Sequence, residues 1–283
     1  MIRKLSILVP VYNEVATVEL LLRRAARVDF QIEREIIAVD DGSTDGSGEV
    51  LQGLADEGLI RFVAHQVNQG KGAAVQTALE QAAGDVVVIQ DADLELNPDD
   101  LPSLLEPVLL GQTLVCYGSR FIGGVRSSIR RTPAYWANRI LNALSNRING
   151  IRITDFNTCY KMMTTAVMRR LGLTQRGFAI EPEITGKLTR LGIAIAERPI
   201  HYKPRTTAEG KKIRLRDVLE YLAAMVRYRF FWTVSTPPGR GVPMTPPVSK
   251  PAMEVAVPAS SQTTSDEQLT SNNGVSGHFV PTS

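Results

Sequence analysis

Short apolar segments alternate with longer amphipathic ones throughout the first 117 residues of this chain. The apolar segments predict strands, and they cover residues 5–9, 35–39, 60–64, 86–89 and 114–117. The amphipathic segments predict helices, and they cover residues 15–26, 47–55, 73–82 and 101–110. Strands and helices that alternate at this spacing indicate an α/β fold, with a mostly parallel sheet flanked by helices.

The second half of the chain is less regular. Residues 121–133 are rich in Gly and Arg and predict a mobile loop. We expect helices over residues 134–148 and 215–231, and a late strand over residues 194–203. From about residue 234 the composition changes, because half of the sixteen prolines lie there among many Ser and Thr. Residues 234–283 are therefore expected to form a disordered tail.

Charge is unevenly distributed along the chain, although the net charge is only +3. Residues 1–119 carry 8 Lys/Arg and 19 Asp/Glu, whereas residues 120–154 carry seven Arg and no acid. Residues 155–283 carry 17 Lys/Arg and 10 Asp/Glu. The acidic part fits a metal site, and the basic part fits an anionic substrate or surface. We expect no nucleic-acid partner, since no nucleic-acid-binding motif accompanies the basic residues.

The two cysteines, Cys116 and Cys159, lie in apolar surroundings and form no CxxC pair. They are expected to be core residues in a reducing compartment, without zinc or a disulfide. Pro10 and Asn13 interrupt the apolar N-terminal segment, which is too short for a signal peptide. No run of about 18 apolar residues occurs, so we predict no transmembrane helix.

An acidic segment, Asp91-Ala92-Asp93-Leu94-Glu95, follows directly on the predicted strand 86–89. This places it at the edge of the predicted sheet formed by the carboxyl ends of the strands, where ligands of open α/β sheets bind. In extended backbone Asp91, Asp93 and Glu95 would share one face. Their oxygens suit Mg²⁺ or Mn²⁺, which would hold a phosphate. The alternative is an acidic loop that caps the helix beginning near Pro98.

Three other polar loops follow predicted strands or precede a predicted helix. The first strand ends in VPVYNE and the second in VDDGSTDG, at the same sheet edge as Asp91. Asp41 would accept hydrogen bonds from a base or ribose, while Ser43 and Asp45 equally fit a turn and helix cap. Lys71, in the sequence NQGKG, would approach a phosphate at a helix start. The alternative for Lys71 is a solvated side chain.

In combination and in this order, VPVYNE, VDDGSTDG, NQGKGAA and QDADLE resemble the motifs of glycosyltransferase family 2 enzymes of GT-A fold. Further matching segments are YGSR at 117–120, TDFNTCYK at 154–161, FAIEPE at 178–183 and YKPR at 202–205. The resemblance covers residues 5–232 and is closest to the branch of dolichyl-phosphate mannosyltransferase and bacterial polyprenyl-phosphate glycosyltransferases. It implies a glycosyltransferase domain over residues 1–214.

This resemblance assigns roles to individual residues. Residues implied to contact the nucleotide-sugar donor are Pro10, Tyr12, Glu14, Val39, Asp41, Lys71, Asp91, Ala92, Asp93 and Lys211. Asp91 and Asp93, with Glu95 where many relatives have Gln, would bind the metal. The implied catalytic residues are Asp93, Arg120 and Arg205. Arg131 and Arg205 would bind the acceptor phosphate.

The implied reaction is an inverting transfer of a sugar, mannose or glucose, from a GDP- or UDP-hexose to a polyprenyl or dolichyl phosphate. Metal and cationic side chains would neutralise the leaving diphosphate. A lipid phosphate needs positioning by Arg more than it needs a general base, because its second pKa is about 6. Two alternatives stay open: the same enzyme class with a soluble or polysaccharide hydroxyl acceptor, and a catalytically silent nucleotide-sugar-binding module. The family's processive synthases carry QxxRW, which this chain lacks.

Residues 215–233 mix apolar, basic and aromatic residues. Val218, Leu219, Leu222, Met225, Val226 and Phe230 would share one helical face. Such a helix suits the surface of an anionic membrane, and the alternative is an ordinary helix packed on the core. We therefore expect a peripheral protein at the cytoplasmic face of the membrane, with a separate membrane-protein partner as an open alternative.

Overall fold

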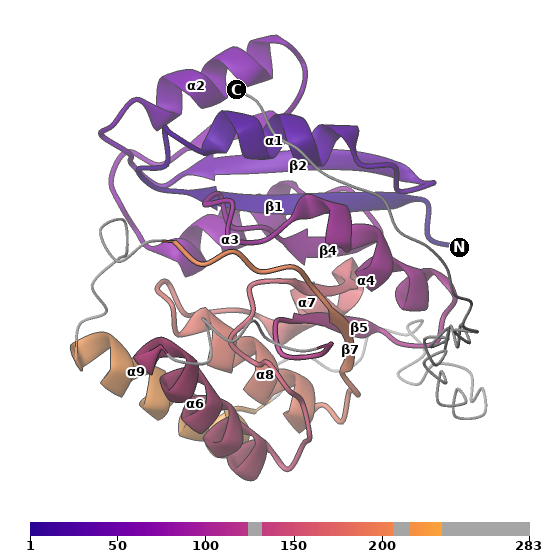
Figure 1. Cartoon of the computed structure of the whole chain (residues 1–283), viewed down its shortest axis with the longest axis vertical. Coiled ribbons are helices and arrows are strands. Elements are labelled where there is room, and N and C mark those ends of the chain that lie inside the picture. The colour runs from indigo at the N-terminus through magenta and orange to yellow at the C-terminus, as the bar shows by residue number, and fades with distance from the viewer. Residues whose placement is uncertain (124–131, 206–214, 234–283) are drawn as a thin grey trace, which may run out of the picture. The chain divides into compact units, whose positions relative to one another are not determined.

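A seven-stranded sheet forms the centre of the protein, as the computed structural model shows (Figure 1). The structure describes residues 1–123, 132–205 and 215–233. The strands follow the order β3-β2-β1-β4-β6-β5-β7 across the sheet. They are β1 (Lys4–Val11), β2 (Glu33–Asp40), β3 (Arg61–Ala64), β4 (Val86–Ile89), β5 (Val115–Ser119), β6 (Lys161–Thr164) and β7 (Ala196–Pro199).

The sheet is mostly parallel, which confirms the predicted α/β class. Strands β3, β2, β1 and β4 pair in parallel, as do β5 and β7. Strand β6 runs antiparallel to both of its neighbours, β4 and β5. The register sets Leu8 of β1 beside Ile37 of β2 and Ile89 of β4, so β1 lies in the interior of the sheet.

Helices cover both faces of the sheet because alternate residues of its buried strands are apolar in both directions. Leu5, Ile7 and Val9 face one core, into which α1, α2 and α4 pack, whereas Leu8 faces the other. Helices α3, α7, α8 and α9 pack into that second core, and α6 borders it. The helices are α1 (Val18–Arg27), α2 (Ser47–Asp56), α3 (Lys71–Gln81), α4 (Leu101–Leu109), α6 (Pro133–Asn149), α7 (Thr165–Leu171), α8 (Ile180–Arg190) and α9 (Leu215–Val226).

The predicted elements of the first 117 residues are present within a few residues of their expected bounds. The late strand is shorter than predicted, because β7 ends at Pro199 and a single bridge then joins Tyr202 to Leu96. Strand β6 and helices α7 and α8 were not predicted. Strand β6 begins with Lys161, whose charge hides the apolar pattern although its side chain is fully buried.

The last helix of the described chain has two parts. Helix α9 continues into a π-helical turn, η2 (Arg227–Phe231), and both contact α8. The predicted single apolar face is divided, since Met225 is buried while Leu219, Val226 and Phe230 are exposed. Residues 124–131 of the predicted loop 121–133 lie outside the described residues, and so does the predicted tail from residue 234.

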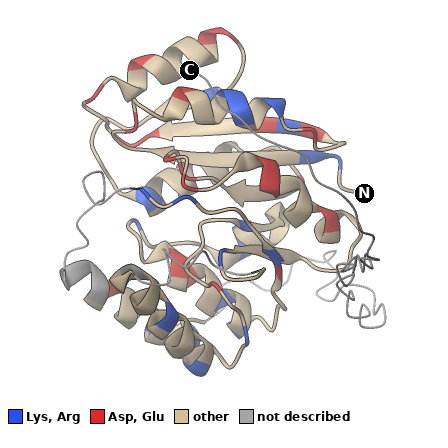
Figure 2. Cartoon of the chain, viewed as in Figure 1, with Lys and Arg blue, Asp and Glu red and all other residues tan. Residues whose placement is uncertain are grey.

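The uneven charge of the sequence is visible in the fold (Figure 2). Helix α2 carries Glu and Asp but no basic residue, whereas α6 carries Arg139 and Arg147 but no acid. Both cysteines are buried and free, as expected for core residues.

Candidate active site

The polar loops lie at the point where the strand order of the sheet reverses, between β1 and β4. Strand β1 lies between β2 and β4, so the chain turns to opposite sides after these strands. Such a switch point opens a crevice at the carboxyl ends of the strands, where ligands of open α/β sheets bind. The segments that follow Val11 of β1 and Ile89 of β4 therefore meet there, and they carry Glu14 and Asp91.

The acidic segment after β4 is a turn and does not continue the strand. Leu94 has a left-handed backbone with φ 57°, and Asp93 Oδ1 accepts a hydrogen bond from Glu95 N at 3.2 Å. Thr17 Oγ1 holds the turn by donating to the carbonyl of Ala92 at 2.8 Å. The expectation of an extended backbone here was wrong, because the left-handed residue breaks the alternation on which it depended.

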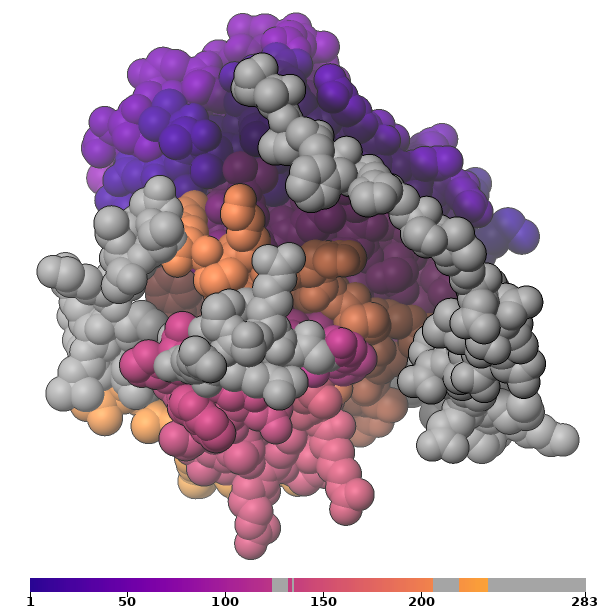
Figure 3. Space-filling model, in the orientation of Figure 1, coloured from indigo at the N-terminus to yellow at the C-terminus, as the bar shows by residue number. Residues whose placement is uncertain are grey.

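Glu95 is turned toward the late segment of the chain. Its Oε1 accepts a hydrogen bond from Arg205 N at 2.9 Å, and its carbonyl accepts one from Lys203 N at 2.9 Å. Glu95 therefore anchors the segment that follows β7. That segment, orange in Figures 1 and 3, lies between the N-terminal half of the chain and α6.

Asp91 is paired with a cation from α3. Lys71 Nζ lies 2.8 Å from Asp91 Oδ1 and 3.0 Å from Glu181 Oε1. Burial alone lowers the pKa of Lys71, but the two carboxylates outweigh it and hold this pKa well above its ordinary value. Lys71 therefore lies beside Asp91, and its contact with a phosphate stays a prediction. Glu181 was not assigned a role, because nothing in the local sequence shows that it meets Lys71, 110 residues earlier in the chain.

The oxygen donors fit a divalent cation. Burial, together with the carboxylates of Asp91 and Glu95, raises the pKa of Asp93 to about 6, so a positive charge here would relieve repulsion. The part of the chain that the structure describes contains no cluster of three or more His, Cys, Asp or Glu placed to hold a metal. Mg²⁺ needs fewer, since it is commonly held by one or two carboxylates plus substrate phosphates. Asp91 and Asp93 would supply these two carboxylates, and their binding of a metal stays a prediction.

Arg205 reaches the same edge from the other side. Its Nη2 pairs with the carboxylate of Glu14, and its Nε lies 3.4 Å from the carbonyl of Asp93. Glu14 is buried, and Thr17 Oγ1 also donates to its carboxylate, at 3.1 Å. The structure therefore brings together Glu14, Asp93 and Arg205, which are far apart in the sequence.

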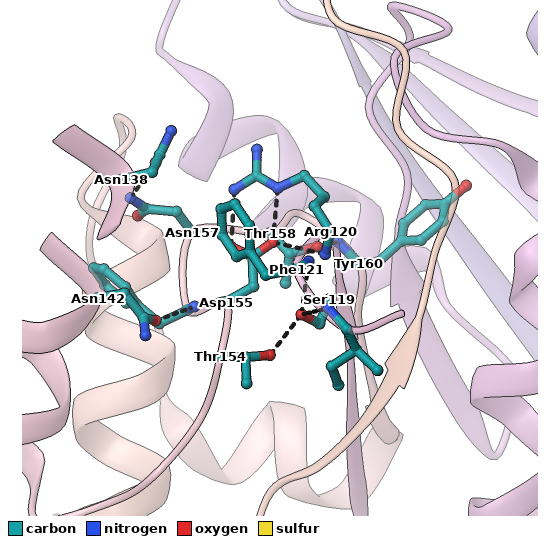
Figure 4. A network of polar contacts seen from close by, with 12 residues as sticks. Ser119, Arg120, Phe121, Asn138, Asn142, Thr154, Asp155, Asn157, Thr158 and Tyr160 are labelled. Atoms are coloured by element: carbon teal, nitrogen blue, oxygen red, sulfur yellow. Dashed lines mark hydrogen bonds and ion pairs between the residues drawn. The ribbon is translucent and has the colours of Figure 1, made fainter. Parts of the chain in front are cut away.

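Arg120 is held by Asp155 in a polar network (Figure 4). The carboxylate of Asp155 accepts hydrogen bonds from Arg120 Nε at 2.7 Å, Nη2 at 2.8 Å and the backbone N at 3.1 Å. The guanidinium also lies over the Tyr202 ring, 5.1 Å from its centre. Arg120 therefore joins the loop 154–160 to the segment after β7. A direct contact of Arg120 with a phosphate stays a prediction.

The predicted nucleotide-binding residues differ in accessibility. Tyr12 is exposed, whereas Val39 and Ala92 are buried. Asp41 is also buried, and its carboxylate contacts His65 Nδ1 at 2.7 Å and accepts hydrogen bonds from Gln69 N and Gly70 N. Asp41 thus holds in place the loop 69–70 before α3, which we call the glycine loop. Pro10, at the end of β1, is partly exposed, and the predicted contacts of Arg131 and Lys211 lie outside the described residues.

Gly70, just before α3, and Gly72, in its first turn, are packed tightly against the loop 174–177. A Cβ at Gly72 would lie 2.1 Å from the carbonyl oxygen of Gln175, and one at Gly70 would lie 2.5 Å from that of Arg176. Ala73 N also donates to the Arg176 carbonyl at 3.0 Å. This contact sets the position of Lys71, which is the first residue of α3.

Gly72→Ala is therefore expected to lower the free energy of unfolding by about 1–3 kcal/mol, the usual cost of overpacking. The reason is that a backbone carbonyl cannot rotate away from the new methyl group. The measurement is the urea midpoint. Gly53→Ala in α2 is the control, because nothing lies within 4 Å of its Cβ, and it should raise stability by about 0.5–1 kcal/mol. An unchanged midpoint for Gly72→Ala would contradict the packing described here.

The chain is similar to known glycosyltransferases. Residues 6–172 match the family model described as "Glycosyl transferase family 2". An undecaprenyl-phosphate 4-deoxy-4-formamido-L-arabinose transferase of Pseudomonas fluorescens is 32% identical over 217 residues, which are 75% of this chain and 60% of that protein. The enzyme of the same name from Pseudomonas savastanoi is 38% identical over 161 residues, which are 55% of this chain and 45% of that protein. The chain thus spans about half the length of these relatives.

Solved structures share the fold. The glucosyl-3-phosphoglycerate synthase of Mycobacterium tuberculosis, in complex with Mn²⁺, UDP and phosphoglyceric acid, superposes with a TM-score of 0.61. The match covers 82% of this chain and 80% of that chain at 22% sequence identity. The same enzyme with Mg²⁺ and UDP gives a TM-score of 0.58 at 22% identity, covering 80% of this chain and 79% of that chain. This likeness supports the GT-A fold.

Proposed function

Because the chain belongs to glycosyl transferase family 2, we propose that it transfers a sugar from a nucleotide-sugar donor to a polyprenyl phosphate. The observation that carries the proposal is the pair of carboxylates, Asp91 and Asp93, at the switch point of the sheet, with Lys71 and Arg205 beside them. The relatives named after undecaprenyl-phosphate sugar transfer support the lipid acceptor.

Asp91 and Asp93 would hold a divalent cation, which supplies neutralisation of the departing diphosphate. Lys71 and Arg205 add positive charge at the same edge. The acceptor phosphate oxygen would attack the anomeric carbon while the bond to the diphosphate oxygen breaks, so the reaction inverts the configuration. The acceptor needs no general base, since a phosphate monoester with a second pKa of about 6 is already ionised near neutral pH.

The proposal names the donor as a nucleotide-sugar and leaves the identity of the sugar to experiment. A mannose or glucose donor and the 4-deoxy-4-formamido-L-arabinose named for the relatives make different demands on the donor pocket. The decisive experiment offers radiolabelled GDP- and UDP-hexoses, and 4-deoxy-4-formamido-L-arabinose linked to UDP or to GDP, to the chain with polyprenyl phosphate. For one of these donors, we expect radiolabel to become extractable into organic solvent. Addition of EDTA should abolish this transfer, because EDTA removes the metal.

The same experiment separates the alternatives. Label that enters only a water-soluble product, when a hydroxyl acceptor is supplied, would favour the soluble-acceptor enzyme. Donor binding without transfer to any acceptor would favour the silent binding module. Transfer that survives EDTA would remove the metal from the proposal.

An exposed apolar stripe on α6 supports a membrane-bound acceptor. Thr132 caps the start of α6, where its hydroxyl accepts a hydrogen bond from Tyr135 N at 3.2 Å, and Gly150 caps its end. Trp136 and Ile140 are 61% and 66% exposed, and Leu144 follows one turn later. Helix α9, which contacts α6, exposes Val226, and η2 exposes Phe230. Exposed apolar residues on helices that also carry arginines suit a membrane interface. No helix within the described ranges is long and apolar enough to span a bilayer.

We expect Trp136→Glu with Ile140→Glu to reduce binding to anionic liposomes about tenfold, because each side chain loses the free energy of apolar burial. Flotation at low salt measures the effect. Leu20→Glu with Leu110→Glu is the matched control, since both leucines are 62–63% exposed but lie on α1 and beyond α4, which cover the other face of the sheet. Equal losses for the two double variants would contradict a specific membrane surface.

A further inference from the structure

A chain of alternating charges leads from Asp91 into the core. Asp91 pairs with Lys71, Lys71 pairs with Glu181, and the other oxygen of Glu181 pairs with Lys161. The exposed fractions of the last three side chains fall from 12% to 7% to 0%. Lys161 Nζ also donates to the carbonyl of Phe156 at 2.9 Å and to that of Thr158. Glu181 is thus shared by two ammonium groups.

The position of Lys71 is not explained by helix formation. Lys71 is the first residue of α3, where the helix dipole disfavours a positive charge. Glu181, in the first turn of α8, is favoured by its own helix dipole. The tight packing of Gly72 on the loop 174–177 brings the two helix starts together. The contact with Glu181 therefore compensates for an unfavourable placement of Lys71.

A cation bound at Asp91 and Asp93 would change this arrangement. Lys71 Nζ lies 2.8 Å from an Asp91 oxygen, so a divalent cation at that carboxylate would repel it. The flexible ammonium would leave Asp91, but its second partner, Glu181, is held in place by the buried Lys161. An incoming diphosphate offers the anion to which Lys71 would then turn.

We propose that Glu181 is a positioning residue that keeps the Lys71 ammonium within reach of the donor diphosphate once a cation has taken Asp91. The inference rests on the proposed function for the identity of the ligand. Lys161 contributes indirectly to the position of Lys71, because it holds the Glu181 carboxylate in place. In the absence of nucleotide, Lys71 competes with the cation for Asp91. With nucleotide, it helps to bind the diphosphate.

The test measures Mn²⁺ binding by electron paramagnetic resonance, alone and with UDP or GDP. Lys71→Met is expected to bind Mn²⁺ alone about tenfold more tightly and the Mn²⁺–nucleoside diphosphate about tenfold more weakly. Glu181→Gln is expected to weaken both, because Lys71 would then hold Asp91 alone. In the Lys71→Met background, Glu181→Gln should change neither affinity further.

A matched control is Lys4→Met, which removes the Lys4–Glu35 pair of 3.0 Å at the opposite end of β1 and should leave both affinities unchanged. An equal effect of Glu181→Gln in both backgrounds would overturn the inference, because Glu181 would then act independently of Lys71. If Glu181→Gln does not fold, Lys71→Met alone decides, and unchanged affinity for Mn²⁺ overturns the inference. Failure of the unaltered protein to bind either nucleotide would instead count against the proposed function, and the Mn²⁺-only measurement would still test Lys71.

Discussion

Asp93→Asn is expected to lower the rate of sugar transfer about a thousandfold, since the contribution of a bound metal to a phosphate-leaving reaction amounts to several kcal/mol. Asparagine keeps the shape of the side chain and the oxygen that accepts Glu95 N, so the turn after β4 should persist. It removes the negative charge that a cation requires. The measurement is kcat with saturating donor and Mn²⁺, together with the thermal midpoint as a check of folding.

Glu95→Gln is the matched comparison for this change. Glu95 uses its carboxylate to accept Arg205 N, and an amide oxygen accepts the same bond, so the rate should fall less than about tenfold, as expected for one neutral hydrogen bond. A loss as large as that of Asp93→Asn would show that Glu95 binds the metal. Full activity of Asp93→Asn would remove Asp93 from the metal site.

Asp155→Asn is expected to lower the free energy of unfolding by about 3–5 kcal/mol, the usual cost of leaving a buried charge unpaired. Asp155 is 1% exposed and is bound by both Nε and Nη2 of Arg120. The burial of Asp155, beside an Arg120 side chain that is only 14% exposed, limits the access of water that could replace the lost carboxylate oxygen. In the unaltered protein burial lowers the pKa of Arg120, and Asp155 outweighs that effect and raises this pKa. Arg120 stays charged in the variant even without Asp155, because a guanidinium is effectively always protonated in proteins. Urea unfolding measures the change.

The control for Asp155 is an ion pair of the same type at the surface. Arg24 and Asp99 lie 2.6 Å apart with about half of each side chain exposed. Asp99→Asn should cost no more than about 1 kcal/mol, because solvent screens the pair. Equal costs for the two substitutions would mean that Asp155 contributes no more than a surface partner and that the network of Figure 4 is not a structural anchor.

Local sequence was sufficient for the parts of the fold that depend on apolar periodicity. The strands from β1 to β5 and the helices between them follow from the spacing of Val, Ile and Leu, because buried strands and amphipathic helices have different periods. Strand β6 was not predicted, because it begins with the charged Lys161 and so does not read as an apolar segment. A buried lysine is tolerated only with partners, and those partners, Glu181 and two carbonyls, come from other segments.

For the candidate site, too, the sequence predicted the location of the residues but not their contacts. The motif order placed Glu14, Asp41, Lys71 and Asp91 at one sheet edge, since the ends of parallel strands meet there. It did not predict that Asp41 would hold the glycine loop. The extended register assumed for Glu95 was wrong because Leu94 is left-handed.

By itself, the sequence determined that the chain forms a mostly parallel α/β sheet and which loops lie at its functional edge, because both depend on local periodicity and on the order of the motifs. Only the tertiary structure decided which charges pair. Lys71 is 110 residues from Glu181, and Arg205 is 191 residues from Glu14. The physical reason is that the partner of a buried charge is chosen by packing in three dimensions, and no local pattern in the sequence records that choice.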